Sequence, residues 1–470
     1  MAFGWGRPAD YDDPFVGFSA IHPLFVVDES GARYEIPKSR LKFFAPESFP
    51  AKKGPNTFRV FCLGGSTVQG RPYSKETSFT TWLRLSLEAA DSSRDWQVVN
   101  CGGISYASYR LVPILEECLG YEPDLIILCT GHNEFLEERT YGDVKNAPPV
   151  VAVPHRMLAR LHTYVALREG VRWITGERAT TVPANRVVLK DEADALLDYR
   201  RGIRAYHRDE AWRAGVIDHF RRNVRGMIGT AENAGVPVFV VLPPSNLCDS
   251  PPFKSEHRRD LSDEELDEWR SLIGQARGHY RDDLPASIRL LKKALALDRA
   301  YAATHYELAK AYEALGLQAQ AREAFLEARE QDVCPLRILR PMEVALADAA
   351  REAGVPLLDA HALLEGECPS GILGNYYLVD HVHPSIPGHQ RIAEGLVRQM
   401  VAQGWVRPVT DWEAKRAAAY DRHEGSLDDF YFLKAERTLR SVRGWTQGRA
   451  DGPPIESRWQ PARDEVESKD

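Results

Sequence analysis

The sequence predicts an α/β fold in which five parallel strands form a sheet with helices on both faces. Five short apolar runs alternate along the chain with segments of helical periodicity. Because these runs lack polar alternation, we expect the strands to be buried on both faces, as in parallel sheets. A chain of 470 residues, with 44% hydrophobic and 27% charged residues, has room for such a domain and for additional segments.

The strands and helices can be placed on the chain from their patterns. Strands are predicted at residues 58–63, 96–99, 124–130, 236–242 and 355–359. Helices are predicted at residues 77–90, 109–119, 218–233, 341–353 and 389–403. In the first helix, spacings of three and four residues join a set of apolar side chains, namely Phe79, Trp82, Leu83 and Leu87. This spacing is typical of a helix that packs one face on a core.

Five regions are predicted along the chain: residues 1–57, 58–261, 262–335, 336–404 and 405–470. The second and fourth are the two parts of the α/β domain, and the third is an insertion. The first is an extension with a small hairpin, formed by runs at 23–27 and 33–36. A helical excursion at 143–215 holds a basic helix that we interpret as a cap on the domain, with contact to a membrane surface as the alternative. The last region is a helical tail with a loose end.

The insertion carries an internal repeat. Four positions recur with a period of 34 residues: Ser287, Leu291, Ala294 and Asp298 return as Ala321, Phe325, Ala328 and Asp332. The period and the alternation of small and large residues resemble a tetratricopeptide repeat, although His305 stands where a large aromatic residue is usual. Fewer than the three repeats needed for a continuous core are present. We therefore expect the insertion to pack on the α/β domain as a lid or docking platform.

Composition and charge argue against several functions. The chain has 60 Lys and Arg against 67 Asp and Glu, which gives a net charge of −7. It therefore lacks the excess of positive charge that is typical of nucleic-acid-binding proteins. Neither a signal peptide nor an apolar run of the roughly 20 residues that span a bilayer is evident, which predicts a cytoplasmic protein. The seven cysteines include no CxxC pair and are expected to be reduced and mostly buried.

Small and polar residues follow three of the predicted strands and precede the last helix. They are Gly64-Gly65-Ser66-Thr67, the segment Asn100 to Ser105, Gly131-His132-Asn133-Glu134, and Asp380-His381-Val382-His383-Pro384. The carboxyl ends of parallel strands meet at one edge of a sheet, where ligands bind. We therefore expect these residues to lie together.

This combination predicts an acyl-transfer site. A serine becomes nucleophilic when a neighbouring imidazole takes its proton, and Ser66 and His383 are the candidates for these roles. Asp380 would orient the imidazole and stabilise its charged form. The two glycines before Ser66 permit a sharp turn and a close approach of the substrate.

Acyl transfer also needs donors for the developing oxyanion, each worth roughly 3 kcal/mol. The candidates are the backbone N–H of Ser66, a backbone N–H in the second segment and the side-chain amide of Asn133. In the second segment both Gly103 and Ser105 remain candidates.

The four segments, in this order, resemble the motifs of the SGNH (GDSL-like) hydrolases. Gly65-Ser66-Thr67 is similar to the nucleophile block, the turn at 102–105 to the glycine block, Gly131-His132-Asn133 to the asparagine block, and the segment 380–384 to the terminal Asp-x-x-His-Pro block. The resemblance covers residues 58–142, 218–250 and 338–403. It implies a flavodoxin-like three-layer sandwich and ester hydrolysis without metal or organic cofactor, on lipids, acyl thioesters or O-acetylated sugars.

The sequence departs from the family pattern at three points. Gly65 stands where the family's name motif has Asp, and Glu134 stands where Asp is common. The insertion is absent from the minimal fold and resembles larger bacterial members whose chains begin with a membrane anchor. If the natural protein has such an anchor, a periplasmic or membrane-associated location replaces the cytoplasmic one.

Seven further residues are candidates for substrate contacts: Arg71, Tyr73, His132, Glu134, Tyr376, Tyr377 and His381. Five of them have a structural alternative, which is packing under the insertion for the tyrosines and support of the Asn133 loop for His132 and Glu134. His381 and His383 can also ligate zinc or iron. However, alternate residues of an extended segment point to opposite sides, and no third ligand cluster is evident. We favour His381 as a residue on the rim of the site and expect no metal.

The leading hypothesis is a serine esterase that acts through an acyl-enzyme. A short acyl group, such as acetate on a carbohydrate, is favoured because the sequence shows no long apolar groove; lipids and thioesters stay open. An O-acyltransferase would use the same three residues. The alternatives from other classes are an interaction protein that binds a protein partner through its insertion, and a metal-dependent hydrolase.

Overall fold

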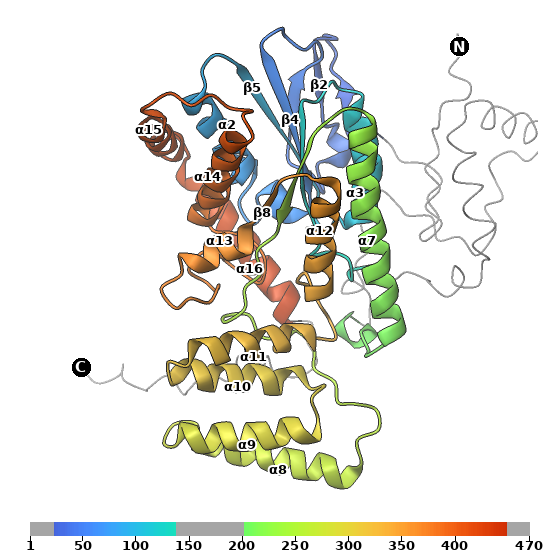
Figure 1. Cartoon of the computed structure of the whole chain (residues 1–470), viewed down its shortest axis with the longest axis vertical. Coiled ribbons are helices and arrows are strands. Elements are labelled where there is room, and N and C mark those ends of the chain that lie inside the picture. The colour runs from blue at the N-terminus through green and yellow to red at the C-terminus, as the bar shows by residue number, and fades with distance from the viewer. Residues whose placement is uncertain (1–22, 138–201, 449–470) are drawn as a thin grey trace, which may run out of the picture.

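The computed structural model describes residues 23–137 and 202–448, and its centre is a five-stranded sheet (Figure 1). The strand order is β5-β4-β6-β7-β8, and all neighbouring strands are parallel. The strands are β4 (Thr57–Gly64), β5 (Asp95–Gly102), β6 (Leu125–Cys129), β7 (Val238–Leu242) and β8 (Leu357–Asp359). The predicted α/β class with five parallel strands is confirmed.

Helices cover both faces of this sheet (Figure 1). One face packs against α3 (Ser108–Leu119), α7 (Glu210–Asn233) and α12 (Arg340–Ala353). The other packs against α2 (Phe79–Ala90), α13 (Ala360–Gly366), α14 (Ile386–Ala402) and α15 (Trp412–Glu424). Along β4, Phe61 contributes to the first core and Cys62 to the second, and both are fully buried. This burial on two faces explains why the strand is apolar at successive positions.

A small antiparallel sheet precedes the main one. It consists of β1 (Val26–Val27), β2 (Arg33–Glu35) and β3 (Ser48–Pro50), in that order. The predicted hairpin corresponds to the first two strands, and its turn is closed by Asp28, whose carboxylate accepts hydrogen bonds from the N–H groups of Ala32 and Arg33. The third strand was not predicted, because three residues ending in proline carry too little periodicity.

The helix before β7 is longer than predicted. It begins at Glu210 instead of residue 218, because Asp209 caps it by accepting a hydrogen bond from the N–H of Trp212 at 2.9 Å. The tail contains α15 and α16 (Asp429–Gly448). The predicted basic helix at 156–174 and the end of the tail lie outside the described residues. All seven cysteines are buried and unpaired.

Four helices lie between β7 and α12 along the chain and stack at one end of the molecule (Figure 1). They are α8 (Asp263–His279), α9 (Leu284–Leu297), α10 (Ala302–Ala314) and α11 (Gln318–Glu330). The corresponding repeat positions Leu291 and Phe325 are both buried in one core with Leu247 and Ile372 of the α/β domain. The Tyr306 hydroxyl also donates to the Cys248 carbonyl at 2.7 Å. The insertion is thus packed on the domain, and its similarity to a tetratricopeptide repeat stays a prediction.

Short helical segments complete the described structure, namely η1 (Lys38–Arg40), α1 (Ser66–Gln69), η2 (Lys75–Thr77) and η4 (Gly202–Ala205). Of these, α1 follows β4 directly and begins at Ser66. Among the described helices, none combines the length and the apolar character that crossing a bilayer requires.

Candidate active site

Ser66, His383 and Asp380 form a continuous chain of hydrogen bonds. Ser66 Oγ lies 2.7 Å from His383 Nε2, and His383 Nδ1 lies 2.7 Å from Asp380 Oδ2. The exposed fraction is 8% for Ser66 and 4% for His383, so these hydrogen-bonded side chains are largely shielded from water. Two residues separated by 317 positions meet because the loop before α14 returns to the edge where β4 ends. Their roles in catalysis are the subject of the proposal below.

The position of Ser66 is set by close packing of α1 against two neighbouring strands. A Cβ atom on Gly64 of β4 would lie 2.3 Å from Val68 Cγ2 of α1, and one on Gly102 of β5 would lie 2.1 Å from the Gln69 nitrogen of α1. Only glycine allows such approaches without a shift of the backbone. The buried Asn100 of β5 adds a hydrogen bond of 2.7 Å from its side-chain amide to the Val68 carbonyl.

Asp380 is held in its ionised form. Its Oδ1 accepts hydrogen bonds of 2.9 Å from the N–H groups of Val382 and His383. Burial by itself would raise the pKa of this carboxyl, but the imidazoles of His383 and His381 and these hydrogen bonds hold the pKa well below its usual value. An ionised Asp380 accepts the Nδ1–H of His383 and so leaves Nε2 free to take a proton from Ser66.

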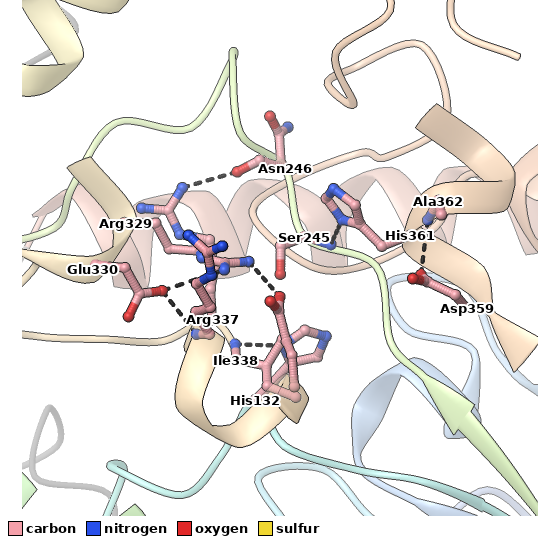
Figure 2. Close-up of polar contacts among 12 residues, drawn as sticks. His132, Ser245, Asn246, Arg329, Glu330, Arg337, Ile338, Asp359, His361 and Ala362 are labelled. Atoms are coloured by element: carbon pink, nitrogen blue, oxygen red, sulfur yellow. Dashed lines mark hydrogen bonds and ion pairs between the residues drawn. The ribbon is translucent and has the colours of Figure 1, made fainter. Parts of the chain in front are cut away.

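The loop that carries Asp380 is braced by Asn246. The Asn246 N–H donates to the His381 carbonyl at 2.9 Å, and its side-chain amide donates to the Asp380 carbonyl at 3.0 Å. Arg337 in turn donates to the Asn246 carbonyl at 2.8 Å (Figure 2). Burial lowers the pKa of Arg337 to about 10, which leaves it charged at neutral pH, and Asp332 lies 3.6 Å away as its counter-ion.

Sequence reasoning missed this brace. Asn246 lies just after β7, and the exit of that strand was not inspected for chemistry although the other strand exits were. A search of every strand exit would have found Asn246. Arg337 carried no such signal, since the Asn246 carbonyl that it binds lies 91 positions away in the sequence.

The structure separates the candidates for the oxyanion site. The Gly103 N–H donates to the Gly64 carbonyl at 3.0 Å, which continues the pairing of β4 with β5, so Gly103 is the weaker of the two candidates. Ser105 has a positive φ of 63°, and its N–H meets no acceptor among the residues that the structure describes. Ser105 is therefore the better candidate of the two.

Asn133 lies directly beside the nucleophile turn. A Cβ atom on Gly65 would be 2.5 Å from Asn133 Nδ2. One amide hydrogen is donated to the Tyr106 carbonyl at 3.0 Å, and a side-chain amide has a second one to offer. The Gly65 that departs from the family motif thus has a physical reason, since any side chain there would displace the Asn133 amide.

His132 and Glu134, predicted as substrate contacts or as loop supports, both have structural partners. The fully buried Glu134 accepts hydrogen bonds from the Ser108 N–H at 2.6 Å and from the Ser108 hydroxyl at 2.9 Å, where α3 begins. His132 Nδ1 accepts a hydrogen bond of 3.1 Å from the Ile338 N–H (Figure 2), and burial holds the pKa of His132 well below its usual value. These contacts agree with the structural alternative for both residues.

His381 is buried and does not lie on the rim, so that prediction was wrong. Its exposed fraction is 8%, and the ring of Phe253 meets it edge-on at 5.1 Å between centroids. Burial lowers the pKa of His381 to about 4.

The alternative that His381 and His383 ligate a metal finds no further ligands in the described residues. Both ring nitrogens of His383 are already hydrogen-bonded, and no cluster of three metal-ligating side chains occurs within residues 23–137 and 202–448.

The remaining candidates divide between the site and its surroundings. The Arg71 N–H donates to the Ser66 carbonyl at 3.1 Å, so its backbone is tied to the nucleophile turn. Tyr73 stacks on Tyr431 of α16 with centroids 6.4 Å apart, and the buried Tyr377 donates to Glu367 at 2.9 Å. Tyr376 is 61% exposed and lines a hollow of about 390 Å³ beside α14. The tyrosines therefore pack beside α14 and α16 and not, as the alternative had it, under the insertion.

Solved structures similar to this one include proteins described as ester-cleaving. One is a putative lipolytic protein of the G-D-S-L family from Desulfitobacterium hafniense, at 12% identity, covering 73% of this chain and 99% of that chain, with a TM-score of 0.32. Another is a lipase/acylhydrolase from Enterococcus faecalis, at 10% identity, covering 75% of this chain and 100% of that chain, with a TM-score of 0.33. A third is a mutant of an acetylxylan esterase from Geobacillus stearothermophilus, at 11% identity, covering 74% of this chain and 96% of that chain, with a TM-score of 0.32.

The sequence itself matches no protein-family model, and the search among curated proteins found no match. The function proposed below therefore rests on the geometry of the site.

Proposed function

We propose that the protein is a serine hydrolase that cleaves carboxylic esters, with Ser66 as nucleophile, His383 as general base and Asp380 as the group that orients the imidazole. The observation that carries this proposal is the pair of 2.7 Å contacts that link Ser66 to His383 and His383 to Asp380. An imidazole with an ionised carboxylate on one nitrogen and a serine hydroxyl on the other is the arrangement that activates serine.

The reaction follows from these contacts. Ser66 Oγ attacks the ester carbonyl and passes its proton to His383 Nε2, and the carbonyl oxygen becomes an oxyanion. The N–H groups of Ser66 and Ser105 and the second amide hydrogen of Asn133 donate to that oxyanion. As the tetrahedral species collapses, the C–O bond to the alcohol breaks and His383 returns the proton to the departing oxygen. Water then attacks the acyl-serine, with His383 again as base, and releases the acid.

A short acyl group suits this site best. This preference rests on the sequence, in which no long apolar groove of the kind that a lipid ester needs is evident. Acetate on a carbohydrate is our favoured substrate. Transfer of the acyl group to a sugar hydroxyl would use the same residues, and product analysis with an added acceptor alcohol distinguishes transfer from hydrolysis.

A fluorophosphonate probe tests the proposal directly, because it reacts only with an activated serine. We expect the wild-type protein to be labelled at Ser66 and the Ser66→Ala variant to be unlabelled. Ser271→Ala, which removes an exposed hydroxyl from α8, is the matched control and should be labelled like the wild type. Chromogenic esters of increasing acyl length, run in parallel, report the preferred chain.

Three results would contradict the proposal. Equal labelling of Ser66→Ala would place the reactive serine elsewhere. Loss of activity with a chelator and its recovery with zinc would favour a metal-dependent hydrolase. No labelling of the wild type and no hydrolysis of any ester would favour an interaction protein that works through the insertion.

A further inference from the structure

The guanidinium of Arg71 has no acceptor in the described part of the chain. Its Nε is buried without a hydrogen-bond partner, and no ion pair or hydrogen bond reaches its side chain from residues 23–137 or 202–448. The buried Arg59 and Arg329 differ in having hydrogen-bond or ion-pair partners, although the Nε of Arg329 is itself without one. Arg59 donates to Gln97 and to two backbone carbonyls, and Arg329 pairs with Glu343 at 2.7 Å. Arg71 thus keeps its donors without a partner in a partly buried position.

This side chain belongs to the surroundings of the candidate active site. The backbone of Arg71 is bound to the Ser66 carbonyl at 3.1 Å, directly after α1. Burial lowers the pKa of Arg71, and the charge of Asp380 opposes that effect, so the guanidinium lies within electrostatic reach of the Asp380 carboxylate. It is nevertheless not paired with it, because Asp380 Oδ2 is bound to His383 and Oδ1 already accepts two backbone hydrogen bonds.

An unpaired, partly desolvated cation is costly, and buried charges in proteins normally have a counter-charge. A planar guanidinium with several unused donors matches a carboxylate, which it can bind through two parallel hydrogen bonds. An acceptor that the protein itself does not supply can come from the substrate.

We propose that Arg71 binds a carboxylate of the substrate, so that the site prefers anionic esters to neutral ones. The inference rests on the function proposed above and narrows its substrate class to esters that carry a carboxylate near the reacting carbonyl. That carboxylate can belong to the alcohol part, as in an acetylated uronic acid, or to the acyl part, as in the half-ester of a dicarboxylic acid.

Matched pairs of esters test both sources of the carboxylate. For the alcohol part, acetate release is compared between O-acetylated galacturonic acid and O-acetylated galactose. For the acyl part, nitrophenol release is compared between the mono-4-nitrophenyl ester of adipic acid and 4-nitrophenyl hexanoate. A hydrogen-bonded charge pair predicts that wild-type kcat/KM is roughly 10- to 100-fold higher for the anionic member of one pair. The same preference should shrink as salt is added.

Variants assign the preference to Arg71. Arg71→Met keeps an unbranched apolar stem without the charge and should abolish the preference, mainly through KM for the anionic ester. Arg71→Lys keeps the charge without the planar arrangement of donors and should retain part of the preference for the anionic ester. Arg84→Met, which removes a charge from an exposed pair on α2, is the matched control and should retain the full preference.

The inference fails if the wild type shows no preference in either pair, or if Arg71→Met lowers kcat/KM equally for both members of the preferred pair. Should Arg71→Met not fold, inhibition of the wild type by free galacturonate or adipate, compared with galactose or hexanol, decides the question. Failure of the proposed function is a different result: either no member of the two pairs would be cleaved, or Ser66→Ala would cleave them as well as the wild type.

Discussion

The two halves of the candidate active site are built in different ways. The nucleophile half consists of Ser66, Ser105 and Asn133, each within a few residues of the end of β4, β5 or β6. The acid half consists of Asp380 and His383, which follow β8 only after α13 and a loop. The first half is held by the sheet itself, through close backbone packing around Gly64 and Gly102. The second is held by hydrogen bonds from another loop.

This difference indicates where the site can be perturbed. A strand exit moves only if the sheet moves, so the nucleophile half should tolerate changes in the surrounding loops. The acid half depends on Asn246 and, through it, on Arg337 at the junction with the insertion. We therefore expect substitutions at Asn246 or Arg337 to shift the positions of His383 and Asp380 without displacing Ser66.

The largest expected effect comes from removing the contact that joins the halves. Ser66→Ala and His383→Ala should each lower kcat by roughly 10⁴- to 10⁶-fold, and the double variant should be no worse than the worse single variant, because the residues act as a unit. Ester hydrolysis measured under saturating substrate checks this. Additive losses in the double variant would show that the two residues act independently.

A smaller loss is expected within the nucleophile half. Asn133→Ala should lower kcat by roughly 100- to 1,000-fold, because the oxyanion loses a preorganised donor, while the melting temperature stays close to that of the wild type. Asn56→Ala, at an exposed position before β4, is the control. If Asn133→Ala unfolds the protein instead, the amide supports the loop through Tyr106 and has no separate role in catalysis.

In the acid half, Asn246→Asp tests the brace. The substitution keeps the shape of the side chain but replaces the amide that donates to the Asp380 carbonyl and to Asn375 Oδ1 by a carboxylate, which repels both oxygens. We expect kcat to fall by roughly 10- to 100-fold with KM nearly unchanged, since a small displacement of a catalytic group has an effect of this size. Steady-state kinetics of Asn246→Asp, Arg337→Met and their combination measure the coupling. A rise in KM alone would mean that Asn246 contacts the substrate.

The smallest effect concerns stability at low pH. His381 has a pKa of about 4 in the folded protein and an ordinary value of 6.5 when unfolded, so the unfolded chain binds more protons below pH 6.5. The stability that depends on neutral His381 is therefore present above that value and is lost as the pH falls towards 4. Between pH 7 and pH 5 this loss is about 2 kcal/mol. Urea unfolding at pH 7 and pH 5 measures the free energy of unfolding, and we expect its decrease between these two values to be smaller by that amount in His381→Gln than in the wild type. Equal decreases in the two proteins would contradict the burial argument.

Much of the fold and part of the site could be predicted from local patterns. The apolar runs identified all five strands because burial on both faces leaves a continuous signal, and the residues after β4, β5 and β6 were noticed because the carboxyl edge of a parallel sheet gathers ligands. His381 was misjudged, because its burial comes from Phe253, which lies far away in the sequence. Gly103 and Ser105 could not be distinguished, because the hydrogen bond from the Gly103 N–H to the Gly64 carbonyl joins two neighbouring strands.

The sequence by itself determined the strands, the helices and the chemical types available at the strand ends, because periodicity and residue chemistry are local properties. Only the tertiary structure decided which donors are free, which charges are paired and how Asp380 is held. Hydrogen bonds between distant segments, such as those of Asn246 and Arg337, leave no periodic trace in the chain. That the guanidinium of Arg71 meets no acceptor within residues 23–137 and 202–448 is visible only when these neighbours are in place.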